Sequence, residues 1–289
     1  MREAAIQIEQ VSKSFQERKV LKNISCELNW GQVYGIVGNN GSGKTVLMKC
    51  ICGLLPYDEG SIRVNGKKIG KDVDFPEDMG MIIESPGFLP GMTGIKNLKI
   101  LAAVNHRIQE SQIRETMRVV GLDPNLKQPV GKYSLGMRQR LGIAQAIMEK
   151  PEILILDEPT AGMDPEERIR IRNFISGCAK DKIVLLATHV VADVENMARE
   201  ILLIKNGKIV RRDTPQKFLA ELEHKVYNVL VTEREGEEYQ NSGARIISVT
   251  LTEKGHRLRI ISADALKTGN VEEVYPCLED VYLYWIDRE

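Results

Sequence analysis

The sequence predicts an α/β fold with a parallel core sheet, an antiparallel β side layer and a small α+β unit at the carboxyl end. Short apolar runs alternate with helix-like segments between residues 33 and 199, and this alternation is typical of a parallel sheet flanked by helices. The strand-like segments near the amino end are expected to form the side layer. After residue 215 the pattern changes to β-like segments and a terminal helical stretch.

Each element of the main unit follows from an apolar run bounded by turn residues. The Asn65–Gly66 pair predicts a hairpin turn, and Pro56 is expected to end the first helix. An all-apolar strand directly before Asp157 is expected to be buried on both faces. Strands are predicted at residues 5–11, 33–37, 61–64, 153–156 and 182–188. Helices are predicted at residues 44–55, 95–120, 136–149, 165–179 and 190–199.

The change in pattern predicts two domains. Residues 1–214 form the main domain, with a helical subdomain at about residues 90–150, and residues 215–289 form an accessory domain. In the accessory domain we expect a helix at 215–222, strands at 226–231, 244–249 and 258–262, a polar loop at 233–243 and a last helix at 278–285.

Composition and charge limit the classes of function. The 289 residues include 40 basic and 40 acidic side chains, so no global field attracts the chain to nucleic acid or to anionic lipid. The apolar runs are much shorter than the roughly 20 residues that cross a bilayer, and the amino terminus has no signal-peptide pattern. We therefore expect a cytoplasmic protein, in which any link to a membrane comes through a partner. The five cysteines are scattered along the chain, which predicts reduced thiols. Their spacing predicts neither a disulfide framework nor a zinc site.

A glycine-rich segment between a strand and a helix carries the first functional motif. It fits the pattern G-x-x-x-x-G-K-[ST] and consists of Gly38, Asn39, Asn40, Gly41, Ser42, Gly43, Lys44 and Thr45. Glycines let the backbone wrap a phosphate, so that successive N–H groups face the anion. We expect Lys44 to bridge the β- and γ-phosphates of ATP and Thr45 to ligate Mg²⁺. The motif predicts a P-loop NTPase, and a glycine turn that binds nothing is the alternative.

Two adjacent carboxylates supply the other half of the chemistry. The apolar strand 153–156 runs into Asp157 and Glu158. We expect Asp157 to hold Mg²⁺, usually through water, and Glu158 to polarise the attacking water. The alternative is that the two acids simply lie at a solvated strand end. The presence of a phosphate-binding loop in the same chain favours the catalytic interpretation.

The remaining motifs resemble those of ABC ATPases, in the same order, over residues 3–213. The resemblance implies a signature motif that acts on the nucleotide of a second subunit and consists of Ser134, Leu135, Gly136 and Met137. Asp164 lies in a segment similar to the D-loop, at the dimer interface, and is also a candidate helix N-cap.

Two single residues extend the resemblance. His189 looks like the switch histidine that contacts the γ-phosphate, although a satisfied polar residue at a strand end is the alternative. Phe15 stands where the family has an aromatic residue stacked on adenine, and simple packing is the alternative. Residues 84–94, 133–137 and 278–283 look like those of ATPases from bacterial drug and peptide-antibiotic exporters, of the bacitracin-resistance or lantibiotic-immunity type.

Three positions depart from the family pattern. Glu84 replaces the usual Q-loop glutamine, and its carboxylate is expected to ligate the metal more directly. Val46 replaces a hydroxyl residue, so that only its backbone N–H serves the α-phosphate. Leu135 and Met137 replace a glycine and a glutamine in the signature.

The resemblance also implies partners. Two ATPase subunits, identical or different, would form a head-to-tail dimer around two ATP molecules, and residues 85–97 would receive a separate transmembrane permease. No nucleic acid partner is expected. Two alternatives stay open, which are a soluble ABC ATPase acting on ribosomes or nucleic acid and a poorly hydrolysing regulatory subunit.

Overall fold

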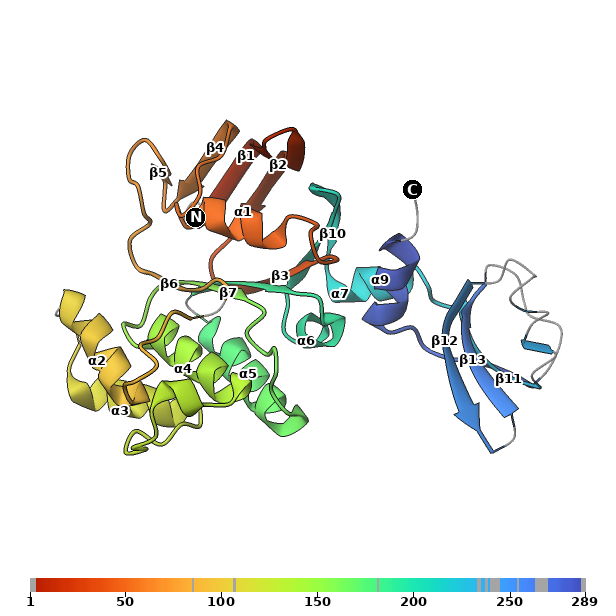
Figure 1. Ribbon diagram of the computed structural model, residues 1–289. Coiled ribbons are helices and arrows are strands. Elements are labelled where there is room, and N and C mark those ends of the chain that lie inside the picture. The colour runs from red at the N-terminus through yellow and green to blue at the C-terminus, as the bar shows by residue number, and fades with distance from the viewer. Residues whose placement is uncertain are drawn as a thin grey trace. The chain divides into compact units, whose positions relative to one another are not determined.

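A six-stranded sheet forms the centre of the larger unit (Figure 1). The computed structural model describes residues 4–84, 86–105, 108–180, 182–232, 235–236, 239, 245–253, 255–262 and 270–286. The strand order is β10-β9-β3-β8-β7-β6, and the strands are β3 (Gln32–Val37), β6 (Met79–Ile82), β7 (Ile153–Asp157), β8 (Ile183–Thr188), β9 (Glu200–Lys205) and β10 (Lys208–Asp213). Strands β3 and β6–β9 pair in parallel, as predicted. The carboxyl ends of β3, β8, β7 and β6 therefore lie at one edge of the sheet.

Helices lie on both sides of this sheet (Figure 1). One side carries α1 (Lys44–Ile51), and the other carries α2 (Gly94–Asn105), α3 (Glu110–Val119), α4 (Leu135–Ile147) and α5 (Pro165–Cys178). A short 3-10 turn (Val130–Lys132) precedes α4, and α6 (Val191–Glu195) follows β8. Among the described residues, none of the helices has the length and apolarity needed to cross a bilayer.

Three predicted helices have different bounds in the structure. Helix α1 ends at Ile51 rather than at residue 55, because Gly53 has a positive φ of 75° and a Cβ there would lie 2.0 Å from the Asp74 carbonyl oxygen. The stretch predicted at 95–120 consists of two helices, α2 and α3, and Gln109 caps the second. Helix α6 ends at residue 195 instead of 199, since the Arg199 N–H already bonds to β3 at 2.8 Å.

An antiparallel sheet forms the predicted side layer. Its order is β2-β1-β4-β5, with β1 (Ile6–Phe15), β2 (Arg18–Leu28), β4 (Glu59–Val64) and β5 (Lys67–Lys68). Asn65 and Gly66 both have positive φ, 53° and 75°, which is the conformation of a two-residue type I′ hairpin turn. The hairpin prediction is therefore confirmed.

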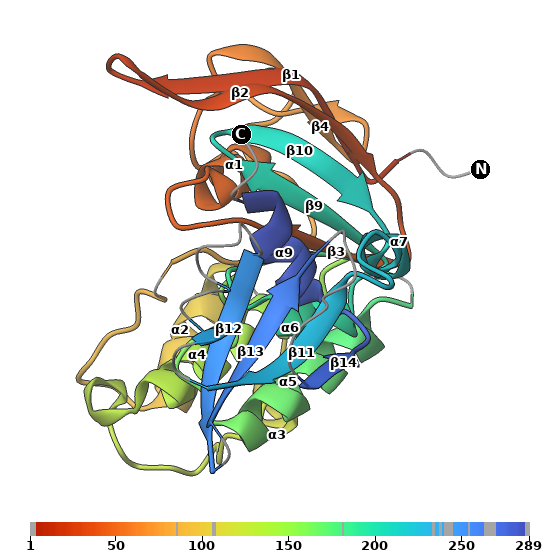
Figure 2. The same ribbon diagram turned by 90° about the vertical axis from the view of Figure 1, so that its right-hand side faces the viewer.

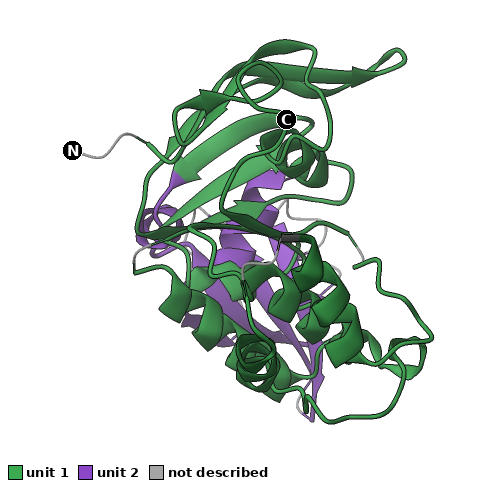
Figure 3. Ribbon diagram, turned by 90° about the vertical axis from the view of Figure 1, so that its left-hand side faces the viewer, with its two compact units in different colours: residues 1–212 green, residues 213–289 purple. Residues whose placement is uncertain are grey.

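The smaller unit comprises residues 213–289 and is built around an antiparallel sheet (Figures 2 and 3). The sequence placed the boundary after residue 214, whereas the larger unit ends at Arg212. The strand order is β12-β13-β11-β14, and the elements are α7 (Pro215–Ala220), β11 (Val226–Val231), β12 (Arg245–Thr252), β13 (Gly255–Ile261), β14 (Asn270–Glu273) and α9 (Leu278–Ile286). Most of the polar loop predicted at 233–243 lies outside the described residues.

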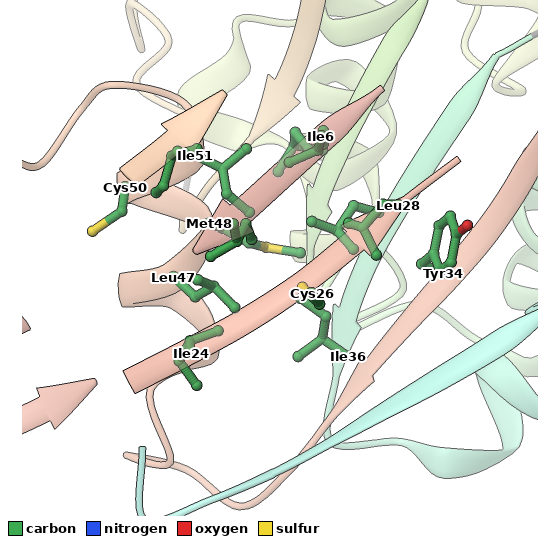
Figure 4. Close-up of a cluster of buried hydrophobic side chains, with 14 of the residues drawn as sticks. Ile6, Ile24, Cys26, Leu28, Tyr34, Ile36, Leu47, Met48, Cys50 and Ile51 are labelled. Carbon is green, nitrogen blue, oxygen red and sulfur yellow. The ribbon is translucent and has the colours of Figure 1, made fainter. Parts of the chain in front are cut away.

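The main hydrophobic core joins α1 to the side layer and the central sheet (Figure 4). Its fully buried members include Ile6, Ile24, Leu28, Ile36, Leu47 and Met48. Cys26, Cys50 and Cys52 belong to the same cluster, and burial raises the pKa of the Cys26 thiol to about 12. All five cysteines are free, as the sequence predicts.

Candidate active site

The glycine-rich loop connects the carboxyl end of β3 to the first residue of α1. Gly43 has a φ of 109°, a conformation that residues with a side chain rarely adopt. A Cβ at Gly38 would lie 2.3 Å from the Ile204 carbonyl oxygen and 2.7 Å from the Ser42 hydroxyl oxygen. Glycine is therefore required at both positions, because a side chain would strain the backbone at one and collide at the other.

Lys44 is held inside this loop. Only 6% of its surface is exposed, and its Nζ donates hydrogen bonds to the carbonyl oxygens of Gly38 at 2.6 Å and Asn39 at 3.2 Å. Burial lowers the pKa of the Lys44 ammonium, whereas the Glu158 and Asp157 carboxylates act in the opposite direction. The cation is thus directed into the cradle, where a phosphate oxygen can replace the carbonyl groups as its acceptor.

Two buried oxygen atoms at this loop mark the space for a ligand. The hydroxyl oxygen of Ser42 and Oδ1 of Asp157 are buried without a hydrogen-bond partner among the described residues. Buried polar atoms are normally paired, so these two are suited to groups that the protein does not supply. A phosphate would pair with the Ser42 hydroxyl, and a cation would pair with Oδ1 of Asp157.

Thr45 and Asp157 form an oxygen pair that suits a magnesium ion. The Thr45 hydroxyl donates a hydrogen bond to Oδ2 of Asp157 at 2.7 Å. Burial raises the pKa of the Asp157 carboxyl, and the bond from Thr45 opposes this shift. Mg²⁺ in nucleotide sites is held by one or two protein oxygen ligands together with phosphates and water, and the two residues fit that requirement.

Glu158 and His189 are in direct contact at the ends of β7 and β8. Oε1 of Glu158 lies 2.7 Å from Nδ1 of His189 and accepts the His189 backbone N–H at 2.9 Å. Oε2 accepts the Thr188 hydroxyl at 3.1 Å. Glu158 also has a positive φ of 49°, and its backbone N–H bonds to Ala187 at 2.8 Å. The carboxylate is therefore oriented by the His189 N–H, the Thr188 hydroxyl and the His189 ring.

Glu84 approaches the site from the strand beside β7. It lies two residues after β6, has a φ of 61°, and its Oε1 pairs with Nζ of Lys49 on α1 at 2.6 Å. Sequence reasoning missed Lys49 as a neighbour of the site. Lys49 left no signal in the sequence, because its pairing with Glu84 depends on the approach of α1 to β6.

Phe15 is exposed, whereas Val46 packs against the core. Phe15 ends β1 and pairs with Arg18, whose side chain reaches within 4.0 Å of the Cβ position of Gly41. The exposed Phe15 ring, 45% accessible, therefore lies on the hairpin beside the phosphate loop. The Val46 side chain packs against the hydrophobic core.

The signature segment lies at the start of α4. The Ser134 hydroxyl caps this helix by accepting the Met137 N–H at 3.1 Å. Gly136 is packed so closely that a Cβ would lie 2.8 Å from Oε2 of Glu167, and Leu135 packs against Gly162. The segment thus contacts the D-loop region of its own chain.

Asp164 starts α5 as the predicted N-cap. Its Oδ1 accepts the Glu167 N–H at 2.8 Å, and Pro165 occupies the first helical position. Glu167 in turn pairs with Arg140 of α4 at 2.5 Å. Helices α4 and α5 are therefore linked by an ion pair that is largely buried.

Comparisons with known proteins agree with this geometry. The pattern of the family described as "ABC transporter" matches residues 21–161. The uncharacterized ABC transporter ATP-binding protein YdbJ of Bacillus subtilis (strain 168) is 40% identical over 72% of this chain and 69% of its own length. The bacitracin transport ATP-binding protein BcrA of Enterococcus faecalis is 36% identical over 72% of this chain and 68% of its own length.

Two further comparisons extend the family and the fold. The lantibiotic transport ATP-binding protein SrtF of Streptococcus pyogenes is 34% identical over 71% of this chain and 89% of its own length. A dimeric ATP-binding cassette, solved in a post-hydrolysis state with ADP and Pi, superposes with a TM-score of 0.67 at 21% identity over 73% of this chain and 98% of that chain. The chain therefore belongs to the ABC transporter family and is an ATP-binding, ATP-hydrolysing subunit of such a transporter.

Proposed function

We propose that the chain powers the export of a peptide antibiotic or a similar compound through a separate membrane permease. Relatives whose names give bacitracin and lantibiotic transport support the class of cargo. The observation that carries the proposed chemistry is the contact of Glu158 with Thr188 and His189 beside the Thr45–Asp157 pair. The subunit is proposed to work at the cytoplasmic face of the membrane, because its link to the membrane is the permease.

The site residues are proposed to divide the work of hydrolysis. The loop amides, Ser42 and Lys44 bind the phosphates, while Thr45 and Asp157 hold Mg²⁺, which offsets the charge that develops on the phosphates. Glu158 accepts the proton of the attacking water as general base. His189 orients that carboxylate through its ring and its backbone N–H.

A second subunit is proposed to complete each site. The Ser134 hydroxyl and the amides near Gly136 would contact the γ-phosphate bound by the facing subunit, at the positive end of α4. Closure of such a dimer excludes water from the site, and loss of phosphate removes the ligand that favours the closed state. The dimeric cassette structure supports this arrangement.

A groove beside the Q-loop is proposed to receive the permease. It has a volume of about 190 Å³ and is lined by Leu54, Met81, Ile82, Ile83, Pro86, Gly87, Gly142 and Gln145. Leu54 is 47% exposed in this groove. Apolar side chains that gather at a surface can form sites of protein contact, and five of the eight residues that line this groove are apolar. Ser85, the first residue of the segment predicted to dock the permease, lies outside the described residues.

The groove predicts the result of a charge substitution. We expect Leu54→Glu to reduce co-purification of the chain with the membrane protein encoded beside it by about tenfold, because a carboxylate resists burial in an apolar contact. Val119→Glu is the matched control, since Val119 is 43% exposed on α3. Equal recovery of the membrane protein with both variants would exclude this groove. Recovery of ribosomes or nucleic acid instead of a membrane protein would overturn the proposed function.

Glu84 predicts a change in the magnesium requirement. An amide oxygen is a weaker ligand for Mg²⁺ than a carboxylate, so Glu84→Gln should raise the Mg²⁺ concentration for half-maximal ATPase activity about two- to fivefold. Glu77→Gln is the control, because Glu77 forms a similar exposed ion pair with Lys67 at 3.0 Å. An unchanged magnesium titration would show that the carboxylate of Glu84 is incidental.

A further inference from the structure

A buried carboxylate close to the active site has no part in the mechanism proposed above. Asp193 lies on α6, and only 1% of its surface is exposed. Its Oδ2 accepts a hydrogen bond from the Thr160 hydroxyl, while Arg172 lies 3.9 Å from Oδ1. Oδ1 itself has no hydrogen-bond partner among the described residues. A buried carboxylate oxygen without a hydrogen bond is unfavourable for stability, so it calls for a functional explanation.

Thr160 connects Asp193 to the loop that carries Glu158. It is 2% exposed and lies between β7 and α5. The Ala161 N–H bonds to the Glu158 carbonyl at 3.2 Å, and the Met163 N–H bonds to the Thr160 carbonyl at 3.2 Å. Thr160 therefore stands at the junction of two successive turns. Fixing its side chain fixes the path of the chain that leaves Glu158.

The segment after β7 is attached to the end of β8 and to α6 through the side chains of Glu158 and Thr160. Thr188 and His189 bind the Glu158 side chain, and Asp193 binds Thr160. Glu158 has a left-handed backbone, with a φ of 49°, and such a conformation persists in a non-glycine residue only where its surroundings impose it. The bond between Thr160 and Asp193 is a second attachment, two residues after Glu158. It prevents the backbone at Glu158 from leaving the left-handed conformation.

We infer that Asp193 is a positioning residue for ATP hydrolysis. By holding the Thr160 hydroxyl it keeps Glu158 in the backbone conformation that directs its carboxylate toward the attacking water. Asp193 acts through Thr160 and not on the nucleotide, so it should affect turnover rather than ATP binding. The inference rests on the proposed role of Glu158.

The test measures ATPase kinetics of the full chain with Asp193→Leu and Thr160→Val, each of which removes one partner of the hydrogen bond between Thr160 and Asp193. Small displacements of a catalytic group lower rates by up to two orders of magnitude, so each variant should lose about 10- to 100-fold in kcat and keep KM within about twofold. Thr160→Ser retains the hydroxyl and should keep kcat within about twofold of the native chain. The double variant should lose no more than the worse single one, because both remove the same contact. Thr116→Val, which removes a hydroxyl bonded at 2.9 Å within α3, is the matched control.

Several outcomes would overturn the inference. These are an unchanged kcat in both single variants, a change in KM without a change in kcat, a double variant whose fold-loss in kcat is the product of the two single losses, and a Thr160→Ser chain as slow as Thr160→Val. Failure of Asp193→Leu to fold leaves Thr160→Val to decide, and failure of both to fold would show a purely structural contact. The Glu158→Gln variant distinguishes failure of this inference from failure of the proposed function. If Glu158→Gln abolishes turnover while Asp193→Leu does not, only the inference fails, and retained turnover in Glu158→Gln would remove the proposed role of Glu158 itself.

Discussion

Replacement of Glu158 by glutamine is expected to lower the turnover of ATP by roughly 10²–10⁴-fold, the usual contribution of a general base. This loss corresponds to about 3–5 kcal/mol of transition-state stabilisation. The glutamine oxygen can still accept the His189 N–H that Glu158 accepts at 2.9 Å, so the loop should keep its conformation. The amide cannot take a proton from water. ATP affinity should therefore stay within about threefold of the native value, because the phosphate contacts are unchanged.

Three measurements check this expectation. They are steady-state ATPase activity, titration with a fluorescent ATP analogue, and size-exclusion chromatography in the presence of ATP and Mg²⁺. Dimers should accumulate, because ATP that is bound but not hydrolysed keeps favouring the closed state. Glu115→Gln on α3 makes the same chemical change at an exposed position and should leave all three readings unchanged. Undiminished hydrolysis would exclude Glu158 as the base.

Replacement of Lys44 by methionine is expected to weaken ATP binding about 10- to 100-fold, since charge-assisted hydrogen bonds contribute roughly 1.5–3 kcal/mol. Methionine keeps the apolar stem, so the core around Leu47 and Met48 should remain packed. It removes the buried Nζ that donates to Gly38 and Asn39. The group lost is the ammonium that is proposed to bind the phosphates. No other residue of the loop, 38–45, has a cationic side chain to replace it.

The melting temperature in the presence of ATP gives a second measurement of binding by the Lys44→Met variant. A ligand that binds only the native state raises the free energy of unfolding by RT ln(1 + [L]/Kd) and so raises the melting temperature. At the same ATP concentration the native chain should therefore show a larger rise than Lys44→Met. Lys67→Met removes an exposed lysine paired with Glu77 and should retain the full rise. An equal rise in all three proteins would show that Lys44 does not bind the triphosphate.

The sequence predicted the elements whose patterns are local. The phosphate loop, the apolar strand before Asp157 and the Asn65–Gly66 turn were all predicted, because glycine positions and buried strands leave direct marks on the chain. Strand β2 was missed. Ile24, Cys26 and Leu28 alternate as a strand should, but Asn23 with a φ of 55° interrupts the pattern before them. A strand with such an interruption has no clean period of two.

The parts of the site that were missed depend on tertiary contacts. The ion pair of Lys49 with Glu84 and the bond between Thr160 and Asp193 join segments that lie far apart in the sequence. Neither pair has a spacing rule, because the distance is set by the packing of α1, α6 and the strand ends. The phosphate loop and the acidic end of the strand at Asp157 could thus be predicted from the chain, whereas these two long-range side-chain pairs could not.

The hydroxyl of Ser134 has a consequence for the speed of assembly. Its oxygen accepts the Met137 N–H through a lone pair, and a hydroxyl that accepts in this way can still donate its hydrogen to another oxygen. The first turn of α4 is therefore already formed and capped in the isolated subunit. Two loaded subunits would meet as preformed surfaces, and their encounter would be governed by diffusion and orientation instead of by the ordering of a loop.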